Sequence, residues 1–245
     1  MIRLYVNQEL NTESELLLDC DASHYLKHVL RQKEGDELHV FNGLQPYGFY
    51  VARIKSIQKR DIILSVANFV SQDTRSPLTI RLFQGISKAE KMDFTIQKSV
   101  ELGVTSIQPL WMEHTQVKLK DKQRLNKKVQ HWQKIACSAM EQSGQNALVS
   151  IEQPISFDNA CQGLSTSSLN IVLNPWTDKT INSIKSLIVK DINIFIGPEG
   201  GISQIELDTL KKYACQDIKL GPRILRTETA SLAIISILQS LGGDF

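Results

Sequence analysis

Cysteine is scarce in this chain, and the few cysteines are widely spaced. The 245 residues contain 4 Cys, and no two of them stand in a C-x-x-C arrangement. Disulfide-stapled secreted domains need a higher density of cysteine, and structural zinc sites need closer spacing. We therefore expect four reduced thiols in a reducing compartment and no bound metal.

Long apolar runs and low-complexity segments are also missing. The longest apolar stretch, residues 230–241, is interrupted by serines and is too short to cross a bilayer. The first residues have no apolar core of the kind found in a signal peptide. With 13 Gly, 7 Pro and 42% hydrophobic residues, the composition excludes a collagen-like or disordered chain. The expectation is a cytoplasmic protein that does not contact a membrane.

Charge is nearly balanced over the whole chain but not along it. The 28 Lys and Arg exceed the 26 Asp and Glu by only two, which argues against a histone-like protein. Residues 114–134 nevertheless carry seven Lys and Arg against one Asp. A phosphate backbone is the natural partner of such a stretch, although many charge runs are only solvated helix faces. A basic patch in a neutral-to-acidic body predicts a local contact with nucleic acid.

Two regions with different secondary-structure patterns follow each other. Residues 1–70 consist mostly of short β-branched and aromatic runs separated by turns, with one helical segment at 22–30, which indicates a small barrel. The polar stretch 71–77 ends in proline and is the best linker candidate. After it, strands and amphipathic helices alternate, which predicts a mostly parallel sheet. We therefore expect an α/β protein with domains at 1–72 and 73–245.

Two glycine-containing loops each join an apolar strand to a helix, the position at which ligands bind in open α/β sheets. The first is Ile196-Gly197-Pro198-Glu199-Gly200-Gly201, and a capping box beginning at Ser203 follows it. This loop lacks the Lys-Ser/Thr of a phosphate-binding loop, and Glu199 suits a cationic ligand better than a pyrophosphate. An ordinary turn that requires glycine is the alternative.

The second loop, residues 220–230, crowds two arginines and a glutamate beside a Gly-Pro turn. Thr227 or Thr229 can cap the helix that follows, and Glu228 would favour its positive end. An ordinary capped helix start with solvated arginines is the alternative. Elsewhere, Glu141 ends an amphipathic helix and is a candidate general base, as any helix-terminal glutamate would be.

The two histidines that stand four residues apart, His24 and His28, could chelate a metal. No third ligand is evident, so we interpret them as surface histidines.

Together these segments resemble one family, the bacterial 16S ribosomal RNA (uracil-N3) methyltransferases, the RsmE group of the SPOUT superfamily. The resemblance covers essentially the whole chain in the right order. It is carried by residues 90–103, 124–128, 132–136, 141–142, 196–201 and 220–230, with His24 and residues 29–31 near the N-terminus. The pairing of Gly-Pro-Glu-Gly-Gly with Leu-Gly-Pro-Arg-Ile-Leu-Arg-Thr-Glu-Thr is specific, whereas either motif alone would be weak.

The resemblance implies a PUA-like β-barrel RNA-binding domain over 1–72 and a SPOUT methyltransferase domain with a trefoil knot over 73–245. It also implies S-adenosyl-L-methionine as methyl donor and a homodimer. The implied reaction is methylation of N3 of a uridine in the decoding region of 16S rRNA, with the rRNA or the small ribosomal subunit as partner. The implied cofactor-binding residues are Leu173, Ile196, Gly197, Glu199, Gly200, Gly201, Leu220, Gly221, Ile224 and Leu225.

Methylation of uracil N3 requires that a weakly acidic imide proton be removed, or that the resulting anion be stabilised. Arg226 is the first candidate for stabilising this charge, and Glu228 and Glu141 are candidates for taking the proton or orienting the arginine. Candidate phosphate contacts are Arg31, Lys118, Arg124, Lys127 and Lys128.

Two positions depart from the family pattern, because His114 and Gln145 stand where the family often has arginine. Either neighbouring lysines replace a contact with RNA, or these positions are structural. Two other functions remain as alternatives: an RNA-binding ribosome-assembly factor without catalysis, and a nucleotide hydrolase. The intact loop motifs argue against the first, and the missing phosphate-binding loop argues against the second.

Overall fold

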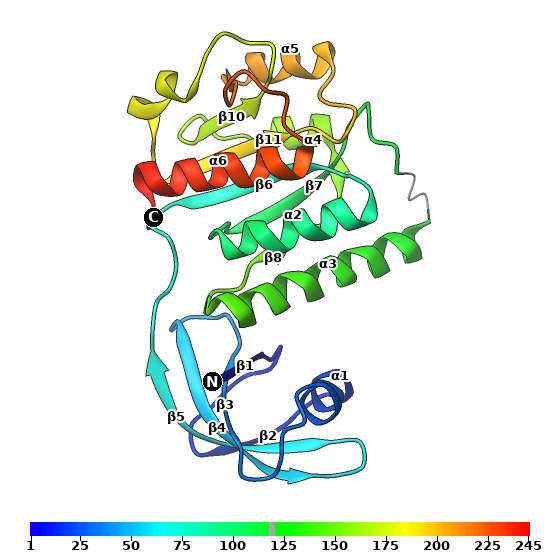
Figure 1. Cartoon of the computed structure of the whole chain (residues 1–245), viewed down its shortest axis with the longest axis vertical. Coiled ribbons are helices and arrows are strands. Elements are labelled where there is room, and N and C mark those ends of the chain that lie inside the picture. The colour runs from blue at the N-terminus through cyan, green and yellow to red at the C-terminus, as the bar shows by residue number, and fades with distance from the viewer. Residues whose placement is uncertain (118–120) are drawn as a thin grey trace. The chain divides into compact units, whose positions relative to one another are not determined.

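The computed structural model describes residues 1–117 and 121–245, and these residues form two compact units (Figure 1). The first unit contains Met1–Arg75 together with Met140–Leu148. The second contains Ser76–Ala139 together with Val149–Phe245. The domain boundary expected after residue 72 stays a prediction. No sequence feature had indicated that residues 140–148 group with the N-terminal half.

The first unit is a five-stranded sheet with one helical segment. The strands are β1 (Ile2–Tyr5), β2 (Ser14–Leu17), β3 (Glu37–Phe41), β4 (Gly48–Ile57) and β5 (Ile62–Ser71). They pair in the order β1-β3-β4-β5-β2, and only β1 and β3 run parallel. Two register shifts between β4 and β5 let this long hairpin bend, as bulges do. Alternate side chains such as Leu38, Val40 and Leu64 form its core.

The helical segment of this unit lies at 20–29 instead of the expected 22–30. It consists of α1 (Cys20–His24) and a π-helical turn, Tyr25–Val29. The carboxylate of Asp19 accepts the N–H of Ala22 and so caps the helix, which explains the earlier start.

The second unit is an α/β layer structure with a parallel sheet, as expected. Its strands are β6 (Thr79–Gly85), β7 (Ser106–Trp111), β8 (Ser150–Ile151), β9 (Ile155–Ser156), β10 (Leu169–Leu173), β11 (Asp191–Ile196) and β12 (Gln216–Ile218). They pair in the order β12-β10-β11-β6-β7-β8, with β9 also on β7, and these pairings are all parallel.

Helices alternate with these strands, as the sequence predicts. They are α2 (Ala89–Glu101), α3 (Lys122–Ser143), α4 (Phe157–Gln162), α5 (Gln204–Lys212) and α6 (Thr227–Gly242), with 3-10 turns at Ile181–Ser183 and Lys185–Leu187. Helix α2 packs against α6, and α4 packs against α5 (Figure 1). Central strands such as β11 are apolar on both faces because both faces are covered.

One helix start differs from the expected capping. Arg226 occupies the N-cap of α6 and makes no side-chain capping hydrogen bond, so neither Thr227 nor Thr229 caps the helix. The Thr227 hydroxyl donates instead to the carbonyl of Gly197, 2.6 Å away. By contrast, the capping box of Ser203 and Glu206 at the start of α5 is confirmed.

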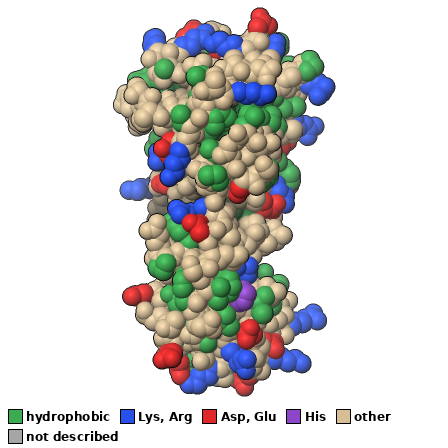
Figure 2. Space-filling model, turned by 90° about the vertical axis from the view of Figure 1, so that its left-hand side faces the viewer, with side chains coloured by type: hydrophobic (Ala, Val, Ile, Leu, Met, Phe, Trp, Pro, Cys, Tyr) green, Lys and Arg blue, Asp and Glu red, His purple; other side chains and the backbone are tan. Residues whose placement is uncertain are grey.

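The four cysteines are free thiols. Burial raises the pKa of Cys161 to about 12, so this thiol stays protonated at neutral pH. No helix in residues 1–117 or 121–245 is long and apolar enough to cross a membrane. Figure 2 shows basic and acidic side chains interspersed over one face, in keeping with the near balance of charge.

Candidate functional site

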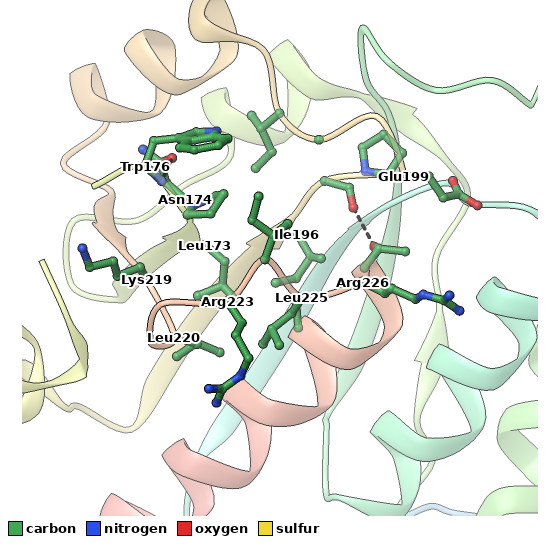
Figure 3. A pocket seen from close by; sticks show the side chains of 18 of the residues that line it. Leu173, Asn174, Trp176, Ile196, Glu199, Lys219, Leu220, Arg223, Leu225 and Arg226 are labelled. Atoms are coloured by element: carbon green, nitrogen blue, oxygen red, sulfur yellow. Dashed lines mark hydrogen bonds between the residues drawn. The ribbon is translucent and has the colours of Figure 1, made fainter. Parts of the chain in front are cut away.

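A pocket of about 290 Å³ opens at the carboxyl ends of three adjacent parallel strands, β10, β11 and β12 (Figure 3). The loops that follow these strands supply most of its lining: residues 173–176, 196–202, 218–221 and 223–227. Lys91 of α2, Leu207 of α5 and Ala230 of α6 complete it. The carboxyl edge of a parallel sheet is where open α/β folds bind ligands, because loops from neighbouring strands converge there.

The ten residues expected to bind a cofactor all line this pocket. They are Leu173, Ile196, Gly197, Glu199, Gly200, Gly201, Leu220, Gly221, Ile224 and Leu225. The interior is largely apolar, whereas charged side chains such as Arg223 and Arg226 extend from the same loop in different directions (Figure 3). Such a pocket suits a flat, partly apolar ligand that is oriented by a few polar groups.

A buried polar network joins the loop after β11 to the loop before α6. Gln84, at the end of β6, is fully buried and pairs in register with Ile196. Its Nε2 donates to the Thr227 hydroxyl and to the Gly85 carbonyl, both at 3.0 Å. The Thr227 hydroxyl in turn donates to the carbonyl of Gly197.

The other end of the Gln84 amide is bonded as well. Its Oε1 accepts a hydrogen bond from the hydroxyl of Ser231, one turn into α6, at 2.8 Å. Ser231 also lies 3.0 Å from the Thr227 carbonyl. Every polar atom of the Gln84 side chain is therefore satisfied, and a fully satisfied network in a low-dielectric core is rigid. Gln84 thus fixes the two loops that form the pocket relative to each other.

Glu199 lines the pocket, but its carboxylate is bonded to the start of helix α2. Its Oε1 accepts the backbone N–H of Lys88 at 3.0 Å, and the ammonium of Lys91 lies 3.7 Å away. Lys88 is the N-cap of α2 and has no side-chain cap of its own. Glu199 therefore places a carboxylate at the positive end of α2 and fastens the loop to that helix. Figure 3 shows its side chain turned away from Leu173 and Ile196.

Two glycines of the loop meet steric requirements. Gly201 has φ +75°, which glycine adopts without strain, and a Cβ on Gly200 would lie 2.7 Å from the Cβ of His114. The ring Nδ1 of His114 is 3.3 Å from the Gly201 carbonyl. His114, one of the departures from the family pattern, thus packs on this loop. At the other departure, Gln145, the backbone carbonyl accepts a hydrogen bond from Arg3.

Of the three expected catalytic residues, only Arg226 lines the pocket. It is exposed and has no ion-pair partner within the described residues. Glu228 lies two residues further on, and positions i and i+2 of a helix do not face each other. One oxygen of Glu228, Oε2, is buried without a hydrogen-bond partner in the described parts of the chain.

Glu141 belongs to the first unit and not to the pocket. Its carboxylate accepts the backbone N–H of Tyr5 at 2.9 Å. Burial raises the pKa of Glu141, while the hydrogen bond from Tyr5 and the charge of Arg3 oppose the rise. These contacts assign Glu141 a structural task, because they tie residues 140–148 to β1.

The residues expected to contact phosphate differ in whether their side chains are already bonded to other described residues. Lys127 is exposed and bonded to no described residue, whereas Arg124 lies 3.7 Å from Asp121. Lys128 is half-buried, 3.8 Å from Asp93 and over the ring of Trp132. Arg31 has φ +53° in the first unit. Lys118 lies outside the described residues.

Several residues that line or support the pocket were not predicted from the sequence, and Trp176 and Gln84 matter most among them. Trp176 lines the pocket and is 79% exposed, held by a turn in which the Asn174 side chain accepts the Trp176 N–H at 3.0 Å. An aromatic residue three positions after the apolar run 169–173 was the available sign. Gln84 carried no sign, because a polar residue within a strand is ordinarily solvent-facing. Within residues 1–117 and 121–245, no group of three or more His, Cys, Asp or Glu side chains could hold a metal.

Comparisons with known proteins agree along the whole chain. A family model for the RNA methyltransferase domain matches residues 74–239, and one for the RNA methyltransferase PUA domain matches residues 17–67. The chain is 39% identical over 245 residues to the ribosomal RNA small subunit methyltransferase E of Buchnera aphidicola subsp. Acyrthosiphon pisum, which covers 99% of this chain and 94% of the relative. It is 30% identical to the protein of the same name in Bacillus subtilis, over 94% of this chain and 92% of the relative.

A solved structure shows the same fold. It is a ribosomal RNA small subunit methyltransferase E from Neisseria gonorrhoeae bound to S-adenosyl methionine. The two chains are 33% identical and superpose with a TM-score of 0.91 over 100% of this chain and 99% of that one. The combination of a PUA-like unit with an α/β methyltransferase unit is thereby confirmed, whereas the trefoil knot stays a prediction.

We predict that Ser231→Ala lowers the free energy of unfolding by about 1–3 kcal/mol, because it leaves the buried Gln84 Oε1 without a donor. Ser236→Ala is the matched control, since among the described residues this serine of the same helix bonds only the Leu232 carbonyl. It should change stability by no more than about 0.5 kcal/mol. Denaturant unfolding of the two variants checks this, and equal effects would show that the network does not constrain the loops.

We also predict that Glu141→Gln raises the free energy of unfolding by an amount that depends on pH. The amide oxygen keeps the bond to Tyr5, and the buried charge is removed. Because the folded pKa of Glu141 is raised, wild-type stability falls as pH rises from below its usual 4.5 through the folded value. The free energy of unfolding of the variant should therefore exceed that of wild type by more at pH 7 than at pH 4. Unfolding at both pH values checks it, and a larger gain at pH 4 would show that attraction by Arg3 outweighs burial.

Proposed function

The chain belongs to the ribosomal RNA small subunit methyltransferase E family, and on this basis we propose that it transfers the methyl group of S-adenosyl-L-methionine to N3 of a uridine in 16S rRNA. The observation that supports this most is the pocket itself. Its two motif loops, which α5 and β12 separate along the chain, meet at one edge of the parallel sheet and are held together by Gln84.

The pocket fits the methyl donor in shape and chemistry. Leu173, Ile196 and Leu225 offer an apolar surface for the adenine, and Trp176 at the rim offers an exposed ring. Gly197 and Gly221 bring backbone amides and carbonyls close to the ligand. The donor supplies an electrophilic methyl group on a sulfonium. The chain's own part is to orient that group by holding the loops rigid, which supports an in-line transfer.

Arg226 is the residue best placed to act on the uracil. It stands at the start of α6, at the edge of the pocket, and its guanidinium has no ion-pair partner in the described chain. Loss of the N3 proton leaves negative charge on the uracil, and a pre-positioned cation lowers the energy of that state. The buried, unbonded Oε2 of Glu228 is a free acceptor for a proton or for an arginine that another molecule brings. Glu141, bonded to Tyr5, is the weaker candidate for a base.

We propose that the enzyme acts as a homodimer on the decoding region of the small ribosomal subunit, in the cytoplasm. Helix α6 buries one face, yet leaves Leu232 and Ile237 only half-buried and Leu241 39% exposed. An apolar helix face of this kind suits a second copy. The exposed cations Arg124 and Lys127 at the start of α3 suit the phosphates of the RNA.

The proposal is tested by mass analysis of unmodified small-subunit RNA incubated with the protein and S-adenosylmethionine. One added methyl group on a uracil is expected. Binding of the RNA with no added mass would instead support the alternative of an assembly factor without catalysis. Cofactor binding is measured separately from the fluorescence of Trp176, with Trp176→Phe identifying its share, because Trp132 is fully buried and Trp111 does not line the pocket.

We predict that Arg226→Ala lowers turnover by about 100-fold or more, because the charge that stabilises the uracil anion is lost. Affinity for S-adenosylhomocysteine should stay within a few-fold of wild type in the fluorescence titration. Arg226→Lys keeps the charge without the planar fork and should restore part of the rate. Full turnover in the alanine variant would assign the arginine a structural task.

We predict that Lys127→Glu chiefly affects RNA binding, whereas Lys128→Glu chiefly affects stability. Lys127 bonds no described residue, so its reversal should weaken RNA binding and reduce the slope of log affinity against log salt by about 0.7–0.9 or more. Lys128 is bound to Asp93 and Trp132, so its reversal should chiefly lower the melting temperature. Salt titrations and thermal unfolding of both variants check this. Equal salt slopes for Lys127→Glu and wild type would place the RNA elsewhere.

A further inference from the structure

The pocket at the sheet edge carries more positive than negative charge. Among the described residues that line it, Glu199 is the one acid. The cations that line it are Lys91, Lys219, Arg223 and Arg226. The methyl donor carries a positive charge on its sulfonium, so an excess of cations does not favour its binding. These cations suit an anion better, and the substrate presents one when the uracil loses its N3 proton.

Two of the four cations are directed elsewhere. The ammonium of Lys219 donates to the carboxylate of Asp178 at 3.3 Å. The side chain of Arg223 extends away from Glu199 in Figure 3. Neither is therefore well placed to meet a uracil that lies next to Arg226.

The other two cations lie on the same side of the pocket as Glu199. In Figure 3 the side chains of Glu199 and Arg226 extend to the same side. Lys91 is there as well, because its ammonium is 3.7 Å from Oε1 of Glu199. Lys91 comes from α2, whereas Arg226 comes from the loop before α6, so two separate elements each bring one cation to this side.

The ammonium of Lys91 is held in place, but its donors are not used up. Oε1 of Glu199 is fixed by the backbone N–H of Lys88, and the Lys91 ammonium is attracted to it without forming a hydrogen bond at 3.7 Å. Lys98 on the same helix is different, because its ammonium donates to both carboxylate oxygens of Glu101, at 2.7 and 3.0 Å. Within the described chain the donors of Lys91 are therefore available to a ligand.

The anion that forms on the uracil has room for two cations. Its negative charge is shared by N3 and the two carbonyl oxygens that flank N3. A single arginine beside one oxygen leaves the other without a partner. A second cation at the other oxygen lowers the energy of the anion further and leaves N3 open to the methyl group.

We propose that Lys91 is a second catalytic residue, which contacts one carbonyl oxygen of the uracil while Arg226 contacts the other. The role of Lys91 rests on the proposed function, since it takes uracil N3 as the methyl acceptor. In the step, the N3 proton passes to a base or to water, and the freed electron pair of N3 forms the bond to the methyl carbon. The electron pair of the broken carbon–sulfur bond stays on sulfur, which becomes a neutral thioether.

The first test is Lys91→Gln, which removes the charge and keeps a polar side chain. Turnover should fall about 10- to 100-fold because one preorganised charge is lost, and Lys91→Arg should restore part of it. The matched control is Lys98→Gln, since both lysines are on α2, both side chains are 35% exposed and each is paired with a glutamate. Lys98 does not line the pocket, so the control should stay within about twofold of wild type.

A substrate with 5-fluorouracil in place of uracil separates a catalytic from a structural role. Fluorine withdraws electrons, so the N3 proton is more acidic and the anion depends less on the protein. The loss caused by Lys91→Gln should therefore shrink to about threefold or less on this RNA. A variant whose pocket is merely misshapen loses the same factor on both substrates. The assay uses a 16S rRNA transcript or the small subunit reconstituted from it, whichever the wild-type protein methylates.

Binding measurements give a readout that does not depend on turnover. Affinity for S-adenosylhomocysteine should stay within about threefold of wild type in Lys91→Gln, because Lys91 acts on the uracil. With S-adenosylhomocysteine bound, wild type should prefer the fluorouracil RNA over the uracil RNA, since a larger share of the fluorouracil is ionised. This preference should be about twofold or more smaller in Lys91→Gln. Thermal unfolding verifies that the variant is folded.

The outcomes distinguish this inference from the proposed function. Equal turnover of Lys91→Gln and Lys98→Gln overturns the inference, and so does an equal loss on both RNAs. Weaker binding of S-adenosylhomocysteine with unchanged binding of methylthioadenosine, which lacks the amino-acid part, also overturns it and assigns Lys91 to the carboxylate of the donor. A wild-type protein that methylates neither RNA refutes the proposed function itself, whereas these other results arise with an active wild type and leave the proposed function standing.

Discussion

The hydrogen bond from the Thr227 hydroxyl to the Gly197 carbonyl is the contact on which the site depends. It joins the loop after β11 to the first turn of α6, and Gln84 holds the same hydroxyl from β6. Without it, the two motif loops would be separate surface turns, each of them an ordinary strand-to-helix connection. With it, the end of β6, the loop after β11 and the start of α6 are fixed relative to one another. Buried polar networks contribute little net stability compared with apolar packing, but a satisfied one admits a single arrangement.

The need to hold the two loops together also explains why some charged residues of the site are bonded within the protein and others are not. Glu199 is used to hold the loop against the N-terminus of α2, where a carboxylate compensates unpaired N–H groups. Thr227 is used within the network, so α6 begins without a side-chain cap. Arg226, one residue earlier, is left without an ion pair in the described chain. A site whose supporting groups are all bonded to each other leaves its few unbonded charges for the ligand.

The sequence predicted the sheet edge well because periodicity and glycine placement are local properties. The alternation of strands and helices predicted the parallel sheet, and the two glycine loops predicted the position of the pocket, whose ten expected residues all line it. Contacts between distant segments carry no local pattern. Gln84 meets Thr227 and Ser231 only after folding, and Glu141 meets Tyr5 because residues 140–148 group with the first unit. The hydrogen bond from the Lys88 N–H that orients Glu199 is likewise a contact between distant segments.

The distribution of charge follows from what the enzyme must avoid as well as from what it must bind. A uniformly basic surface would hold any polyanion, since the attraction to phosphate is independent of sequence. Here the cations form small groups, one at the start of α3 and one at the β4–β5 turn, on a chain with a near-neutral sum. Each group alone gives weak binding that salt suppresses. If both groups contact RNA, an RNA that reaches both would be bound more tightly than one that reaches a single group, because the second contact is then intramolecular. Such selectivity would come from having two weak basic groups rather than from the strength of either.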